Sequence, residues 1–208
     1  MTAEEIVGIE ARARAHADAA DMRQAVTVLL EAYGRELFGF LITRLRDYDA
    51  AREVFGDFAE DLWKGFPGFR WQCSARVWCY TLARHAASRY VQQARRFSEH
   101  NVPLSRAGPL SEIAERVRTE TAIALRTETK SRISQLREQL PVDDQTLLIL
   151  RVNRELSWEE IAQIMLFDDV AEPAELKAGA TRLRKRFQAA KDKLRRLAHE
   201  AGILDKDG

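Results

Sequence analysis

The sequence predicts an all-α fold, with two small helical domains joined by a linker and a helix-turn-helix in the C-terminal domain. Apolar residues recur at steps of three and four over long stretches, as they do along one face of a helix. No stretch of any length alternates apolar and polar residues as a strand would. A segment with two prolines and a glycine, "SEHNVPLSRAGPL", interrupts the helical pattern near the middle of the 208 residues.

The predicted domains follow from where these patterns start and stop. We expect an N-terminal extension over 1–25, a first helical domain over 26–97, a linker over 98–124, a second helical domain over 125–200 and a tail over 201–208. In the first domain we expect helices over 26–46, from 49 to about 66 and from 74 to about 96, with "GFPGFR" as a breaker. The Ala-rich extension is expected to be helical or frayed and carries no functional signal.

Charge is segregated along a chain that is nearly balanced overall, with 33 Lys and Arg against 32 Asp and Glu. Residues 47–61 hold six acids and one base, whereas residues 62–98 hold seven bases and no acid. Residues 141–173 are acidic again, and residues 174–197 hold nine bases against two acids. Basic segments attract phosphate and acidic segments suit a basic protein partner, although a charge run is often only a solvated helix face.

The sequence offers little for catalysis or metal binding. Cys73, Cys79 and His85 form a C-x5-C-x5-H pattern, but six-residue steps on a helix do not bring side chains together. We therefore expect free thiols, no metal and no cofactor. The chain has four scattered histidines and no Gly-rich phosphate loop or paired acid and base, so we do not expect an enzyme. The absence of a long apolar run or a secretion signal predicts a cytoplasmic protein that does not insert into membranes.

The C-terminal half carries the most specific pattern. A helix is expected over 143–152, and "SWEEIAQIM" then opens with a capping box of Ser157 and Glu160. Pro173 pre-sets the start of a long helix, with Gly179 as a mild weak point. Its apolar stripe is Leu176, Ala180, Leu183, Phe187, Ala190, Leu194 and Leu197. This order favours a helix-turn-helix whose second helix enters the major groove of DNA, over an amphipathic helix with a solvated basic face. The residues expected to face DNA are Lys177, Thr181, Arg182, Arg184 and Lys185.

Three motifs in order resemble the extracytoplasmic-function group of the sigma-70 family, over about residues 26–200 with a gap at the linker. "FRWQCSARVWCYTLARHAASRYVQQARR" resembles the family's minus-10 segment through Phe69, Ser74, Arg76, Trp78, Tyr80, Ala83, Arg84, Ala87, Arg95 and Arg96. "AREVFGDFAEDLW" resembles its acidic helix, and departs from it at Arg52 and Gly56. "LPVDDQTLLILRVNRELSWEEIAQIM" resembles the start of its minus-35 domain.

The resemblance implies a transcription initiation factor that binds core RNA polymerase, directs it to promoters through minus-10 and minus-35 elements, and assists DNA melting. The implied minus-10 residues are Trp71, Ser74, Arg76, Trp78, Tyr80, Arg84, His85, Arg89, Arg95 and Arg96. Trp71 is the best stacking candidate, while Trp78 and Tyr80 also suit a core. The five basic-face residues given above would hold the minus-35 element. Polymerase would contact Glu53, Asp57, Phe58 and Asp61. The implied partners are core polymerase, promoter DNA and, in some members, an anti-sigma factor or other regulator.

Two other classes of function stay open from the sequence. A helix-turn-helix regulator would bind duplex DNA tightly without polymerase. A helical interaction module would sequester a partner protein without touching DNA, and its binding would depend weakly on salt.

Overall fold

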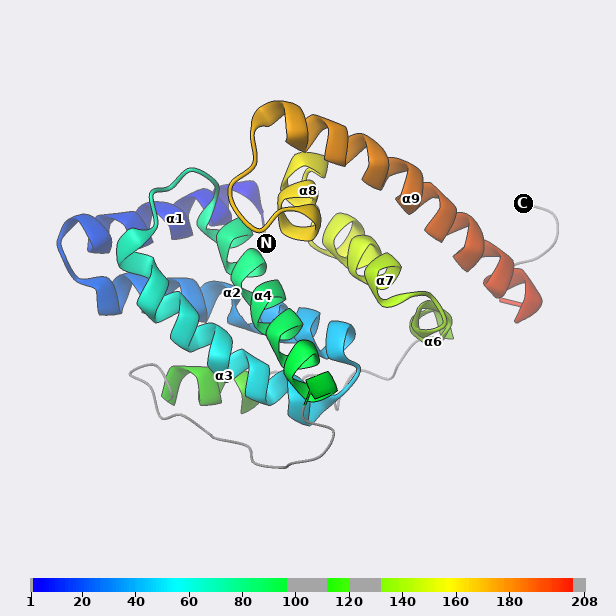
Figure 1. Ribbon diagram of the computed structural model, residues 1–208, viewed down its shortest axis with the longest axis horizontal. Helices are drawn as coiled ribbons and strands as arrows, with labels where there is room; N and C mark the ends of the chain where they lie inside the picture. The colour runs from blue at the N-terminus through cyan, green and yellow to red at the C-terminus, as the bar shows by residue number, and fades with distance from the viewer. Residues whose placement is uncertain (1, 97–111, 120–131, 204–208) are drawn as a thin grey trace. The chain divides into compact units, whose positions relative to one another are not determined.

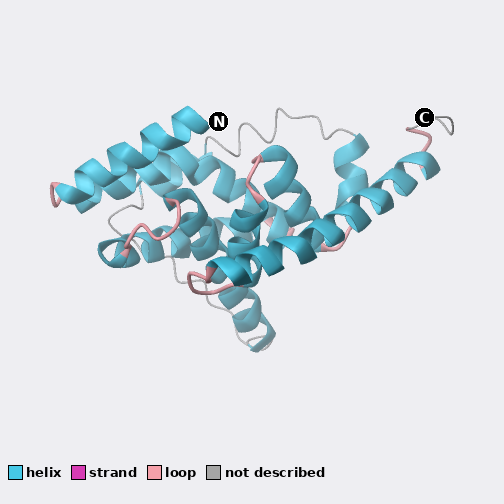
Figure 2. Ribbon diagram, turned by 90° about the horizontal axis from the view of Figure 1, so that it is seen from above, coloured by secondary structure: helices cyan, strands magenta, loops and turns pink. Residues whose placement is uncertain are grey.

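The computed structural model describes residues 2–96, 112–119 and 132–203 (Figure 1). Helices and connecting loops make up this described part, and no strand occurs in it (Figure 2), so the predicted all-α class is confirmed. The chain divides into two compact units, Met1–Ala124 and Leu125–Gly208. Among these helices, none is both long and apolar enough to cross a membrane.

The first unit is built around α2 (Met22–Leu45), which packs against α1 (Ala3–Asp18), α3 (Tyr48–Gly65) and α4 (Ala75–Arg96). Aspartates cap two of these helices, because the side chains of Asp21 and Asp47 accept hydrogen bonds from the first turns of α2 and α3. A single 3-10 turn, η1 (Phe66–Gly68), follows α3 where "GFPGFR" predicts a break. Large apolar side chains fill the centre: Leu29, Leu30, Leu37, Phe38, Phe40, Leu41, Phe55, Phe58 and Leu62.

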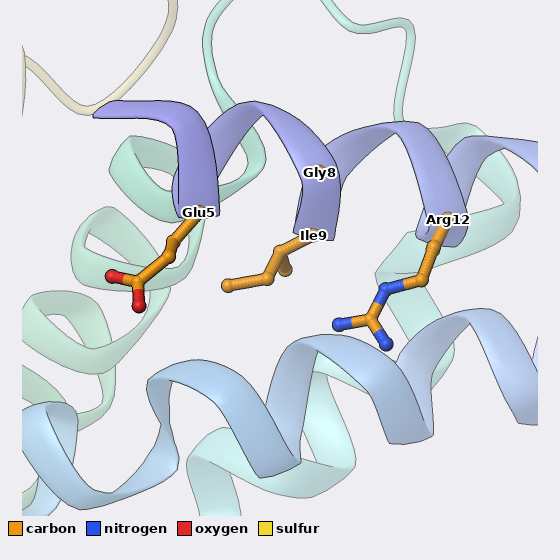
Figure 3. Close-up of a pocket in the computed structure, with 4 residues that line it drawn as sticks. All are labelled: Glu5, Gly8, Ile9 and Arg12. Atoms are coloured by element: carbon orange, nitrogen blue, oxygen red, sulfur yellow. The ribbon is translucent and has the colours of Figure 1, made fainter. Parts of the chain in front are cut away.

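The N-terminal extension belongs to this unit. Thr2 and Glu5 form a capping box at the start of α1, and Ile9 and Ala13 are buried, so the helix is fixed at both its end and its inner face. A pocket on α1 is lined by Glu5, Gly8, Ile9 and Arg12, and the side chains of Glu5, Ile9 and Arg12 point to the same side of the helix (Figure 3). The pocket contains none of the candidate residues from the sequence.

The second unit consists of α6 (Arg132–Glu138), α7 (Val142–Leu148), the π-helical turn η2 (Ile149–Asn153), α8 (Trp158–Leu166) and α9 (Pro173–Glu200). The capping box at the start of α8 is present: Glu160 N–H donates to the Ser157 hydroxyl at 3.2 Å, and Ser157 N–H donates to Glu160 Oε2 at 2.7 Å. Pro173 is the first residue of α9, as predicted. Helix α9 packs along α8, α7 and α6, so its outer face stays open.

Most of the predicted linker lies outside the described residues. The exception is a helix over 112–119, drawn in Figure 1 as the short green helix between two grey stretches, which packs within the first unit. The predicted domain limits stay predictions.

Candidate nucleic-acid interface

The outer face of α9 carries the basic residues that the sequence places there. The side chains of Lys177, Thr181, Arg182, Arg184 and Lys185 are all exposed, while Ala180, Leu183 and Ala190 of the apolar stripe are buried. Lys177, Arg182 and Lys185 form no ion pair with any residue that the structure describes. Their positive charge is therefore available to an anion in solution.

Arg184 differs from its neighbours because it also ties α9 to α8. Its guanidinium lies 3.8 Å from a Glu159 carboxylate oxygen and 5.8 Å from the centre of the Trp158 ring. Trp158 packs edge-on against Phe187 of α9, with ring centres 5.3 Å apart. A substitution at Arg184 would change the packing of two helices as well as the surface charge.

Gly179 and Gln163 position α8 against α9, a role that the sequence did not predict for either of them. Gly179 is buried, and a Cβ there would lie 3.0 Å from Leu166 Cδ1 and 3.1 Å from Ala162 Cβ. Gly179, expected as a mild weak point of the helix, also allows the two helices to approach closely. Gln163 fixes the loop between them: its side chain donates to the Asp169 carbonyl at 2.8 Å and accepts from Ala171 N–H at 2.9 Å.

Arg76 of α4 is not a surface residue, which corrects its prediction as a DNA contact. Its side chain is 4% exposed and forms two parallel hydrogen bonds to Glu36 of α2, at 2.7 and 2.9 Å. Burial alone would lower the pKa of Arg76, but the hydrogen bonds and charge of Glu36 raise it. The guanidinium is therefore a charged group inside the fold, paired with a carboxylate 40 residues earlier in the chain.

Three more residues of the predicted minus-10 set also serve the fold. Tyr80 is fully buried, with its ring 5.3 Å from that of Phe40, so its predicted contact with DNA is wrong. Trp78 is half-buried and stacks on Phe69 at 4.4 Å. The Ser74 hydroxyl accepts a hydrogen bond from Val77 N–H at 3.2 Å, at the start of α4. Tyr80 therefore belongs to the core, while Trp78 and Ser74 each make a contact within the fold.

Trp71 lies in the loop before α4 with a left-handed backbone, at φ 55°. Such a conformation is strained for a bulky residue and persists only where surrounding contacts impose it. The Trp71 ring packs on Phe69, with centres 4.9 Å apart, and the Arg14 guanidinium of α1 lies 5.6 Å from its centre. The half-buried Trp71 ring thus has a guanidinium next to it. That guanidinium comes from the N-terminal extension, in which the sequence shows no functional signal.

The remaining basic residues of α4 lie along its C-terminal half. Arg84 and His85 are half-buried, and their Nη2 and Nε2 atoms lie 2.8 Å apart. Arg89 is exposed and pairs with Asp61 of α3. The side chains of Arg95 and Arg96 lie outside the described residues. All five stay candidates for DNA contact.

The predicted polymerase-binding residues divide between surface and core. Glu53 and Asp57 are exposed on α3, and burial together with the charge of Asp57 raises the pKa of Glu53. Asp61 is partly exposed and held by Arg89. Phe58 is fully buried, so its predicted contact with polymerase is wrong. Its spacing of four from Val54 and Leu62, both buried, is the signal that could have placed it in the core.

The cysteines form no ligand set in the structure. Burial raises the pKa of Cys73 to about 11 and raises the pKa of Cys79 further, because a buried thiolate is poorly solvated. Both thiols are free and protonated near neutral pH. No group of three or more His, Cys, Asp and Glu side chains suited to a metal ion occurs in the described part of the chain.

Comparisons with known proteins give two curated relatives. RNA polymerase sigma factor YlaC of Bacillus subtilis (strain 168) is 28% identical over 150 residues, which cover 69% of this chain and 80% of the relative. RNA polymerase sigma-H factor of Pseudomonas aeruginosa PAO1 is 25% identical over 146 residues, covering 69% of this chain and 76% of the relative. Both similarities support a sigma-70-family, ECF-like sigma factor. The recognition made from the three motifs is thus confirmed.

No family model matches this sigma-factor-like chain, and no solved structure matches it. Its candidate surfaces therefore depend on the geometry described above. The assignments of single residues to DNA or to polymerase stay predictions.

Proposed function

We propose that this protein is a transcription initiation factor that binds core RNA polymerase and directs it to promoters with minus-10 and minus-35 elements. The proposal rests on the similarity to two named RNA polymerase sigma factors. The single structural observation that carries it is the open basic face of α9, where Lys177, Arg182 and Lys185 have no acidic partner among the described residues. The role is one of binding, and it uses no catalytic side chain.

In this proposal, α9 contacts the minus-35 element. Helices α8 and α9 act as a helix-turn-helix, with the N-terminal half of α9 in the major groove. Capping at Ser157 and the Gln163 hydrogen bonds fix α8 and the loop. Arg182 can read a guanine edge with two hydrogen bonds, and Lys177 and Lys185 hold phosphates.

In this proposal, Trp71 and the basic residues around it contact the minus-10 element. A melted strand offers unstacked bases and phosphates, and aromatic faces next to cations bind both. Arg70 and Arg14 are exposed and lie next to Trp71, the first in sequence and the second across the ring. Arg84 and Arg89 extend the positive surface along α4, and His85 lies beside Arg84. Arg76 acts through Glu36 by holding α4 on α2.

Glu53 and Asp57 lie on the exposed side of α3 and are here called the acidic ridge. In this proposal, the acidic ridge contacts polymerase. Burial and then the charge of the neighbouring Asp57 raise the pKa of Glu53, so the charged form of Glu53 is disfavoured in the folded chain. A basic partner surface would relieve the repulsion between the two carboxylates, which supports a binding role for the ridge.

Binding of a labelled promoter duplex, with and without core polymerase, tests the proposal. A sigma factor is expected to bind the duplex poorly alone and with promoter specificity once polymerase is added. Tight binding by the chain alone would favour the helix-turn-helix regulator instead. Absence of binding under both conditions, with low salt dependence of any protein contact, would favour the interaction module.

A pair of substitutions on α9 locates the contact. Arg182→Ala with Lys185→Ala should weaken the polymerase-dependent complex and lower its salt slope by about one for each cation removed. Lys193→Ala with Arg196→Ala removes the same charge from exposed positions further along α9 and should change little. Equal losses from the two pairs would mean that charge alone, not position, decides binding.

A further inference from the structure

The helix over 112–119, here called the strap helix, docks on a surface made by α2 and α3. Ala114 and Val117, three residues apart and on one face, are 2% and 5% exposed. A short helix on its own is only marginally stable in water, so contacts with the rest of the unit must hold it. Its apolar side is therefore its docking side.

Gly34 of α2 allows this close approach. A Cβ at Gly34 would lie 2.9 Å from Val117 Cγ1 and 3.4 Å from Cζ of Phe55 on α3. The first distance is shorter than a Cβ tolerates, so a side chain at this position would force the Val117 side chain to move unless that residue were also made smaller. Gly34 thus marks the floor of the docking surface.

Charged groups on both sides of this apolar contact are matched. Arg52 of α3 lies 3.2 Å from Glu115, and Glu31 of α2 pairs with Arg116. Arg118 donates to the Arg52 carbonyl oxygen at 2.9 Å and would lie 3.6 Å from a Cβ at Gly56. Arg52 and Gly56 are the two positions where the acidic helix departs from the family pattern in the sequence. In this structure both receive the strap helix.

We propose that this surface, formed by Glu31, Gly34, Arg52, Phe55 and Gly56, is a helix-docking site that the strap helix occupies in the free chain and a helix of core RNA polymerase takes in the complex. The partner helix carries a small apolar side chain over Gly34, an acid toward Arg52 and a base toward Glu31. The site directly adjoins the acidic ridge, because Arg52 precedes Glu53 and Gly56 precedes Asp57 in α3. This inference rests on the proposed function and adds a masked part to its polymerase contact.

Occupancy of the site by the strap helix weakens the apparent affinity for polymerase. A binding-competent form that makes up one tenth of the molecules lowers the apparent affinity roughly tenfold. Exposed ion pairs contribute little each, so the strap helix can leave at moderate cost. Polymerase then competes with a segment of the same chain for one surface.

A reversible lock tests the competition on the full chain. Gly34→Cys with Val117→Cys places two thiols where the Val117 methyl and a Gly34 side chain would meet, within reach of a disulfide. The oxidised protein should bind core polymerase roughly tenfold or more weakly than the same protein after reduction. Thiol titration verifies the bond, and Val117→Cys alone, which keeps Gly34, controls for oxidation at Cys73 or Cys79.

A variant that releases the strap helix tests the opposite prediction, an increase in polymerase affinity. Val117→Asp buries a charge at the contact and should expel the helix, which raises polymerase affinity toward the intrinsic value. Thr119→Asp adds the same charge at an exposed position and should match the wild type. If the cysteine pair fails to oxidise, equal affinities of wild type and Val117→Asp overturn the inference.

The outcomes separate this inference from the proposed function. Normal polymerase binding by the wild type, unchanged by lock and release, overturns the masked site and leaves the sigma-factor proposal standing. Failure of every form to bind core polymerase overturns both. A weaker oxidised form together with a tighter Val117→Asp form supports both.

Discussion

Helices α4 and α9 are the two basic helices of this protein, and their charges are used differently. On α9 the residues that the stripe directs outward are exposed, and three of them have no acidic partner among the described residues. On α4 Arg76 turns inward to Glu36, and Arg89 pairs with Asp61. Basic residues are thus exposed without an acidic partner on α9, whereas two of those on α4 are paired with acids of neighbouring helices.

The difference comes from how many neighbours each basic residue has. Helix α4 packs against both α2 and α3, so part of its surface that would face solvent on an isolated helix faces another helix. A carboxylate from α2 then satisfies the buried arginine. Helix α9 is long, and its basic stripe lies opposite the helices that it packs against. A charge run predicts a surface only where one side of the helix is open.

Breaking the buried ion pair should have the largest effect. Arg76→Met leaves Glu36 buried without its partner, and we expect a loss of about 3–5 kcal/mol in the stability of the first unit. Urea unfolding followed by tryptophan fluorescence measures it, since Trp63, Trp71 and Trp78 all lie in that unit.

Removing both charges is the matched control. Arg76→Met with Glu36→Met should recover most of that loss, because an apolar pair of similar volume replaces a buried ion pair at little cost. A double variant as unstable as the single one would show that Arg76 matters for reasons other than its pairing.

The close contact between α8 and α9 at Gly179 is expected to give the next largest effect. Gly179→Val would force a branched side chain against Leu166 and Ala162, and we expect a loss of about 1–3 kcal/mol for the second unit. Ala178→Val introduces the same side chain at an exposed position and should cost only its lower helix propensity. Thermal unfolding of the two variants checks the difference, and equal melting temperatures would refute the close approach.

Separate substitutions of Trp71 and Arg14 distinguish the contribution of the ring to DNA binding from that of the neighbouring guanidinium. Trp71→Ala should weaken binding of the holoenzyme to a premelted minus-10 strand by about 1–3 kcal/mol, which is the usual contribution of one stacked base. Arg14→Ala should cost about 0.5–1 kcal/mol. Arg12→Ala removes the same charge from the α1 pocket and should have no effect, so a loss equal to that of Arg14→Ala would point to general electrostatics.

The smallest expected effect concerns the acidic ridge. Since the folded state raises the pKa of Glu53 above its ordinary 4.5, through burial and then Asp57, the charged form is disfavoured on folding. The stability that this carboxyl contributes is present below pH 4.5 and is lost as pH rises through the folded-state pKa. Glu53→Gln should therefore melt slightly higher than wild type at pH 7, with no difference at low pH. It should also bind polymerase more weakly.

Local signals were enough to predict much of the fold. The Ser157 capping box, the start of α9 at Pro173 and its apolar stripe all depend on residues a few positions apart. The Arg76–Glu36 pair, the cation of Arg14 on Trp71 and the strap helix over Gly34 join segments 40 or more residues apart. Periodicity along one helix contains no information about which distant side chain will meet it. The exposure of the predicted residues is therefore confirmed on α9 and only in part on α4, and their contact with DNA stays a prediction.

Run-off transcription by core polymerase with three forms of the chain tests the central claim most directly. Wild type and the Glu36→Met, Arg76→Met double variant should both give a promoter-specific transcript, because neither charge touches DNA. Arg182→Ala with Lys185→Ala should give several-fold less transcript from a promoter that depends on its minus-35 element. Absence of any promoter-specific transcript with wild type, or its loss in the stable double variant, would contradict the account.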